Sequence, residues 1–158
     1  MNGRSKLALL ASLTLVISQS AFAAEPNATL WNGTWHLNAA KSKFASSAKE
    51  ASETRSYDIS GKKVTMKSSS KNSAGKALNF SYTAGYDGTW YPMTGNPNAD
   101  RISLKVVSDR EVKASSQLKG KPSVESTATV SEDGKHLTLK RKMLRLKGAP
   151  TDVLEFDR

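Results

Sequence analysis

Residues 124–143 read VESTATVSEDGKHLTLKRKM, and they contain the pattern that decides the fold. Apolar or small side chains alternate with polar ones on both sides of the Asp133-Gly134 pair. An alternation of period two places every second side chain on the same face of a strand. An Asp-Gly pair between two such segments favours the tight turn of a β-hairpin. The stretch therefore predicts two antiparallel strands that share one buried face.

The same alternation continues on both sides of this hairpin, separated by turn residues. It predicts ten short strands, at residues 31–37, 55–59, 64–67, 78–84, 89–91, 102–106, 112–118, 124–130, 137–143 and 153–156. Residues 38–52 are predicted to form a loop with at most one helical turn, and residues 68–76 a polar loop. The connections are too short for crossover helices, so neighbouring strands pair antiparallel. Closure removes exposed edges, and the prediction is an all-β fold, a single antiparallel up-and-down β-barrel of about eight to ten strands.

The N-terminal residues have the features of an export signal. Arg4 and Lys6 precede an uncharged run at residues 7–17, and Ala21-Phe22-Ala23 supplies a small-x-small cleavage pattern. A membrane anchor is the alternative, but the uncharged stretch is barely long enough and contains several Ser, Thr and Gln residues. We predict a cleaved signal peptide at residues 1–23 and a barrel domain at residues 24–158. The mature protein is then periplasmic or secreted, without stable membrane insertion.

Charge and cysteine content exclude some classes of function. The chain has no cysteine, which excludes disulfides, thiol nucleophiles and thiolate metal sites. Its formal net charge is +10, which favours anionic partners such as envelope polyanions. The cations are nevertheless spread along the chain without interleaved aromatic residues, and only residues 140–147 form a cluster. This distribution favours a solvated basic surface, and no nucleic-acid partner is expected.

The sequence shows no constellation of catalytic or metal-binding residues. His36 and His136 have the parity of outward-facing residues, and no Gly-x-Ser-x-Gly elbow or phosphate-binding glycine motif is present. Asn96, Asn98 and Asp100 resemble the start of a calcium loop, but the later glycine and glutamate are missing, which favours a turn. We therefore expect no catalytic residue, no metal and no cofactor. The sequence gives no signal for an oligomeric state.

Ligand binding inside the barrel is the strongest functional indication. Small residues at inward positions, such as Ala114 and Ser126, leave either a flattened core or a cavity. Arg141 interrupts an apolar face and points inward. It is either an anion-binding group for an amphiphile such as a fatty-acid carboxylate, or a cation at the rim that pairs with a glutamate such as Glu155. The candidate lining residues are Tyr57, Met66, Phe80, Tyr82, Trp90, Leu104, Val112, Leu139, Arg141 and Met143.

Several motifs carry a resemblance to a known family. Gly33-Thr34-Trp35 is similar to the G-x-W signature of lipocalins and related barrels. Together with Tyr86-Asp87-Gly88 and the C-terminal Phe156-Asp157-Arg158, it resembles a family of small secreted bacterial lipocalin-like proteins. The resemblance implies an up-and-down barrel whose mouth admits small hydrophobic ligands. It also implies that Trp35 lies at the closed end, covered by an arginine from the last strand, for which Arg158 is the nearest match.

Three hypotheses about function follow from these observations. The first is an exported barrel that binds a small hydrophobic or amphiphilic ligand without catalysis. The second is a basic interaction module with a solid core that docks on envelope polyanions or on a protein. The third is an enzyme that works in the barrel mouth, for which analogy of fold is the only support.

Overall fold

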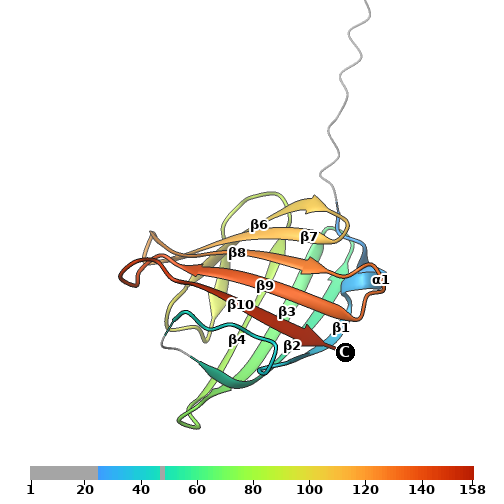
Figure 1. The fold of residues 1–158 in the computed structure, drawn as a ribbon. Coiled ribbons are helices and arrows are strands. Elements are labelled where there is room, and N and C mark those ends of the chain that lie inside the picture. The colour runs from blue at the N-terminus through green and yellow to red at the C-terminus, as the bar shows by residue number, and fades with distance from the viewer. Residues whose placement is uncertain (1–24, 47–48) are drawn as a thin grey trace, which may run out of the picture.

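The chain forms a closed barrel of antiparallel strands (Figure 1). The computed structural model describes residues 25–46 and 49–158, and the predicted signal peptide lies outside them. In the described part, no helix is long and apolar enough to cross a membrane. The elements are α1 (Ala28–Trp31), β1 (Gly33–Leu37), β2 (Glu50–Ser60), β3 (Lys63–Asn72), β4 (Ala77–Gly85), β5 (Tyr91–Thr94), β6 (Arg101–Ser108), β7 (Glu111–Leu118), β8 (Lys121–Val130), β9 (His136–Met143) and β10 (Thr151–Asp157). The predicted all-β, up-and-down barrel is confirmed.

Each strand pairs with the next one along the chain, and β1 closes the barrel by pairing with β10. The register follows the alternation in the sequence. Leu139 on β9 lies opposite Ala128 on β8 and Leu154 on β10, so all three point to the same side of the sheet. Most apolar side chains thereby share one face of the sheet, and closure turns that face into the interior of the barrel.

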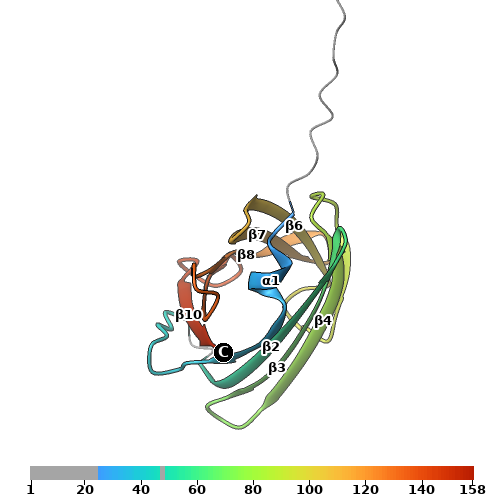
Figure 2. The ribbon, with the colours of Figure 1, turned by 90° about the vertical axis from the view of Figure 1, so that its right-hand side faces the viewer.

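The two ends of the barrel differ in how they are covered. Helix α1 lies across one end, which we call the closed end, as Figure 2 shows. Trp31 of α1 is buried, and its Nε1 donates to the carbonyl oxygen of Asp109 in the β6–β7 turn at 2.9 Å. The opposite end, which we call the mouth, carries the β1–β2, β3–β4, β5–β6, β7–β8 and β9–β10 connections. The structure thus distinguishes the two ends, which the sequence does not.

Several predicted boundaries were wrong, and two of them have a clear local cause. Trp31 belongs to α1 rather than to the first strand, because Asn27 caps a helical turn and accepts a hydrogen bond from the Thr29 backbone nitrogen at 3.0 Å. The polar segment predicted as a loop at residues 68–76 begins as a continuation of β3, which extends to Asn72. Ser68 and Ser70 are buried there on the inner face of the sheet. The alternation in this part of β3 was missed because serine residues, and not apolar ones, occupy its inward positions.

A seam runs along the barrel between β10 and β2 on the side of the mouth. Strand β1, which separates them, ends at Leu37, and the chain then follows β10 toward the mouth. Lys43 and Val153 exchange backbone hydrogen bonds of 2.7 and 2.8 Å along this path. The β1–β2 connection therefore takes the place of a missing strand segment beside β10. Contacts between side chains link β10 to β2 along the rest of the seam.

Candidate functional site

A cavity of about 300 Å³ occupies the interior of the barrel. It extends from Trp31 at the closed end to Asn72 and Asn98 at the mouth. The volume lies at the lower limit of the range that small-molecule sites occupy. The predicted residues that line the cavity are Tyr57, Met66, Phe80, Tyr82, Leu104, Val112, Leu139, Arg141 and Met143.

Small side chains on two neighbouring strands make room for the cavity. Ala114 and Ser116 on β7 lie opposite Ser126 and Val124 on β8, and all four residues line the cavity. Larger side chains on the other side of the barrel, from β2 to β4, face them across the interior. The interior is therefore not completely filled, because one part of its wall has only small side chains to contribute.

The prediction that Trp90 lines the interior was wrong. Trp90 lies on the β4–β5 connection, outside any strand, and is 41% exposed. The alternation that orients a side chain applies only within a strand, and β5 begins at Tyr91. Met93 on β5 lines the cavity instead.

A group of charged residues, which we call the charged band, crosses the interior near the mouth. It consists of Glu50, Glu53, Arg55, Arg141 and Asp152. The first four line the cavity, and Asp152 lies behind Arg141 and is fully buried. Burial of charge is costly unless the charges are paired. Of these residues, only Arg141 was predicted from the sequence to face the interior.

Arg141 is held by two carboxylates. Its Nη1 lies 2.9 Å from Glu50 Oε1, and its Nη2 donates to Glu50 Oε2 at 2.9 Å and to Asp152 Oδ2 at 3.0 Å. Burial on its own lowers the pKa of Arg141, but the two carboxylates outweigh it and raise that pKa. The suggested partner Glu155 was wrong, since it accepts a hydrogen bond from Thr138 instead. Arg141 therefore bridges β9 to β10 and β2 across the seam.

Asp152 anchors the β1–β2 connection to the same seam. Its Oδ1 accepts from the backbone nitrogens of Ala45 and Ser46 at 2.8 Å, and its Oδ2 accepts from Ser46 Oγ at 2.8 Å. Burial on its own raises the pKa of Asp152, but the hydrogen bonds from Ser46 and Arg141 hold it below its ordinary value. Asp152 is thus an ionised, saturated acceptor with a structural role.

Arg55 and Glu53 form a second ion pair, deeper in the barrel. Arg55 Nε donates to Glu53 Oε1 at 2.6 Å, and Ser68 Oγ donates to the same oxygen at 2.7 Å. The guanidinium carbon lies 5.3 Å from the ring centroid of Phe156 and 5.9 Å from that of Phe80. Burial lowers the pKa of Arg55, but Glu53 and Tyr57 raise it above its ordinary value, so the side chain stays cationic.

The second oxygen of Glu53 is left without a partner. Glu53 is 4% exposed, and among the described residues its buried Oε2 has no hydrogen-bond partner. An unpaired buried acceptor is costly and uncommon in proteins. The charged band as a whole contains three carboxylates and two guanidinium groups, so it carries one negative charge in excess.

Tyrosines form the part of the wall between the charged band and the closed end. Tyr57, Tyr82 and Tyr86 all line the cavity. Burial raises the pKa of Tyr82 well above its ordinary value and does the same for Tyr86. The phenols of Tyr82 and Tyr86 therefore remain protonated and offer neutral hydroxyl groups next to apolar surface.

Arg158 covers the closed end of the barrel. Its guanidinium carbon lies 4.3 Å from the centroid of the fully buried Trp35 ring. Nη1 donates to the Asn32 carbonyl oxygen at 2.7 Å, Nη2 donates to that of Leu30 at 2.8 Å, and Nε donates to that of Gly134. A cation against an indole face and three carbonyl acceptors together fix α1 and the C-terminus to each other.

Gly33 permits this close approach. Its φ of +123° lies in a region that side chains other than glycine rarely adopt. A Cβ atom there would lie 3.3 Å from Arg158 Nη1. The glycine of the Gly-x-Trp motif therefore lets the chain leave α1 and enter β1 beneath the arginine.

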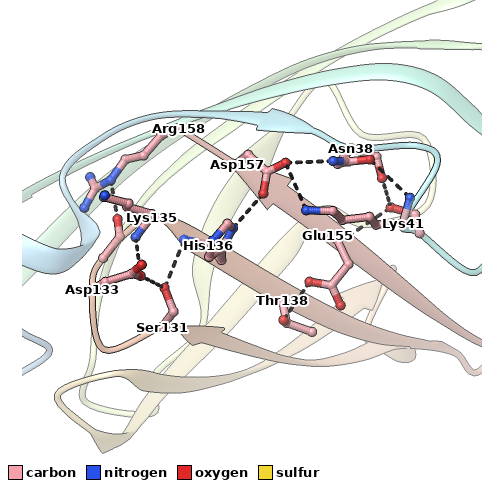
Figure 3. A network of polar contacts seen from close by, with 12 residues as sticks. Asn38, Lys41, Ser131, Asp133, Lys135, His136, Thr138, Glu155, Asp157 and Arg158 are labelled. Carbon is pink, nitrogen blue, oxygen red and sulfur yellow. Dashed lines mark hydrogen bonds and ion pairs between the residues drawn. The ribbon is translucent and has the colours of Figure 1, made fainter.

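A polar network on the outer wall includes one of the two histidines, as Figure 3 shows. His136 Nδ1 lies 2.7 Å from Asp157 Oδ1, and Asn38 Nδ2 donates to Asp157 Oδ2 at 2.7 Å. Both side chains of the His136–Asp157 pair are more than one-third exposed, and neither lines the cavity. A catalytic base must lie in a pocket that holds the substrate. This pair instead joins β9 to β10 on the exposed outer surface.

The calcium-like motif at the mouth forms turns. Asn96 Oδ1 accepts from the Asn98 backbone nitrogen at 2.9 Å, and Asp100 Oδ2 accepts from that of Lys119 at 2.8 Å. Within residues 25–46 and 49–158, no group of three His, Asp or Glu side chains is arranged to hold a metal ion.

Comparison of the chain with protein-family models, with curated proteins and with solved structures gives no match. The function of the chain is therefore inferred from its own residues.

Proposed function

We propose that the protein is an exported, lipocalin-like barrel that binds a small hydrophobic or amphiphilic molecule in its interior without catalysis. The observation that carries the proposal is the cavity of about 300 Å³ between α1 and the mouth. Well-packed protein interiors contain few voids larger than a water molecule. A space of this size costs stability, and a bound ligand compensates for that cost.

The distribution of side chains supports an amphiphile. The inner part of the cavity contains Val64, Met66 and Val112, all of which are buried and apolar. The charged band lies nearer the mouth, where Glu50 begins β2. An apolar tail at the closed end and a polar head near the mouth match this order. The charged band also shows why the interior is not suited to a ligand that is apolar along its whole length.

The binding experiment titrates the mature protein with octanol, a small neutral amphiphile, in an isothermal titration calorimeter. We expect saturable binding with one site per chain. The variant Ala114→Phe places a ring in the cavity and lowers the affinity by at least about tenfold. The matched control is Ser115→Phe, which adds the same ring at an exposed position on the outer face of β7. It changes the affinity less than about twofold.

Absence of saturable binding by the wild-type protein would contradict the proposal, as would equal effects of the two variants. The alternative function, a basic interaction module, predicts a different pattern. In that case the chain binds anionic vesicles with an affinity that falls steeply with salt, and Ala114→Phe leaves that affinity unchanged.

A further inference from the structure

We infer that the cavity selects amphiphiles whose head group is cationic and donates hydrogen bonds, a primary ammonium group above all, and discriminates against carboxylates. The inference rests on the proposed function and defines the class of ligand. It replaces the alternative in which Arg141 binds a fatty-acid carboxylate. Three observations on the charged band support it.

The first observation is that both arginines are already engaged. Arg141 faces the carboxylates of Glu50 and Asp152, at distances of 2.9 to 3.1 Å. Arg55 donates from Nε to Glu53 and faces two aromatic rings. An incoming carboxylate would compete with carboxylates that the fold already holds in place. A carboxylate head group therefore finds no guanidinium group in the charged band that lacks an ionic partner.

The second observation is the balance of charge. The charged band has one negative charge in excess, and Coulomb interactions are stronger in a partly desolvated interior than in water. Lys76 also lines the cavity, but its side chain lies at the mouth on an exposed stretch of chain, where solvent screens it. A cationic head that enters the charged band brings it to neutrality, whereas an anionic head doubles the excess.

The third observation is the unpaired oxygen of Glu53. Ser68 and Arg55 both donate to Oε1, and among the described residues nothing donates to the buried Oε2. The missing partner is a donor, and an ammonium group has three N–H donors without an acceptor. A charge-assisted hydrogen bond to this oxygen is stronger than one between neutral groups. Glu53 is thus the residue that distinguishes one head group from another.

The size of the cavity sets the length of the tail. At about 30 Å³ for each water-sized group, 300 Å³ holds roughly ten non-hydrogen atoms. Octylamine, octanol and octanoate have nine or ten non-hydrogen atoms each, share one tail and differ in the head. Differences between their affinities therefore report the effect of the head group, because the contribution of the tail is nearly the same in all three.

The experiment measures the binding of each of the three compounds to the wild-type protein at pH 7 by isothermal titration calorimetry. We expect octylamine to bind at least about tenfold more tightly than octanoate, with octanol between them. Octanoate binding as tightly as octylamine, or more tightly, would overturn the inference and leave the proposed function intact. Failure of all three compounds to bind would instead contradict the proposed function.

Two variants identify the residue responsible. Glu53→Gln keeps the volume of the side chain and removes its charge, which leaves Arg55 without its ionic partner. We expect octylamine to lose about tenfold in affinity and octanoate to gain. The matched control is Asp100→Asn, which also changes a carboxylate with one buried unpaired oxygen but lies outside the cavity lining. Neither affinity changes by more than about twofold in the control.

Circular dichroism establishes that each variant is folded before the affinities are compared. If Glu53→Gln does not fold, the order of the three compounds on the wild-type protein still decides the question. If it folds and keeps the wild-type preference for octylamine, Glu53 does not determine which head group is preferred, and the inference is wrong.

Discussion

The two ends of the barrel use arginine in opposite ways. At the closed end, Arg158 lies on the ring of Trp35 and donates to backbone carbonyl oxygens. Near the mouth, Arg55 and Arg141 face carboxylates inside the barrel. The first arrangement uses neutral acceptors, and the second needs charged ones.

The difference separates a structural joint from a site. Each nitrogen of the Arg158 guanidinium has an acceptor, so this arginine is part of a structural joint. The charged band also joins strands, but it holds an excess of negative charge and an unpaired oxygen on Glu53. Fully satisfied polar networks stabilise a fold, whereas unsatisfied groups are often functional. The comparison therefore supports the proposal that the head group of a ligand lies near the mouth.

The largest expected effect is the loss of a buried ion pair. Arg141→Met leaves the carboxylates of Glu50 and Asp152 without their cation, and we expect the free energy of unfolding to fall by about 3–5 kcal/mol. Urea denaturation followed by circular dichroism measures the change. The control Arg145→Met removes an exposed cation two residues after β9 and costs less than about 0.5 kcal/mol. Equal stability of the two variants would show that the charged band does not hold the seam.

A smaller effect is expected at the closed end. Arg158→Met removes the cation from the Trp35 ring and the donors from three carbonyl oxygens. Two of these contacts are solvent-exposed, so water replaces part of what is lost. We expect a decrease of about 1–2 kcal/mol in the same denaturation experiment. A loss as large as that of Arg141→Met would remove the distinction between the two ends.

The smallest effect concerns an exposed carboxylate near the closed end. Hydrogen bonds from the backbone and hydroxyl of Thr89 and from the Tyr91 hydroxyl lower the pKa of Asp87 to about 2. Because the pKa is lower in the folded chain than its ordinary value of 3.8, the ionised group stabilises the fold above pH 4. That contribution disappears as the pH falls toward 2. The difference in urea midpoint between wild type and Asp87→Asn should therefore shrink over this range, and a constant difference would contradict the assignment.

Much of the barrel follows from the period-two alternation in the sequence. The hairpin of residues 124–143 and the inward parity of Tyr57, Met66 and Tyr82 were predicted from it, and the register places these side chains on the inner face. Strand ends were less predictable. Trp31 has the parity of the first strand but lies in α1, because a local cap and Gly33 redirect the chain.

The charged band was only partly predictable. Glu53 and Arg55 have the parity of Tyr57, and Asp152 has the parity of Leu154, so a search that included charged residues would have found them. Glu50 has the opposite parity to Glu53. It reaches the interior because the pairing of β2 with β3 shifts between Glu50 and Ser52. A bulge of this kind changes which face a residue occupies, and the alternation in the sequence does not reveal where a bulge lies.

Nuclear Overhauser effects between octylamine and the isotope-labelled protein are the most direct measurement of the central claim. If the ligand lies in the barrel with its head at the charged band, its terminal methyl group contacts the methyl groups of Val64 and Val112. Contacts confined to outer-face residues of β2 to β4, such as Thr54 and Lys67, or no intermolecular contacts at all, would contradict the account.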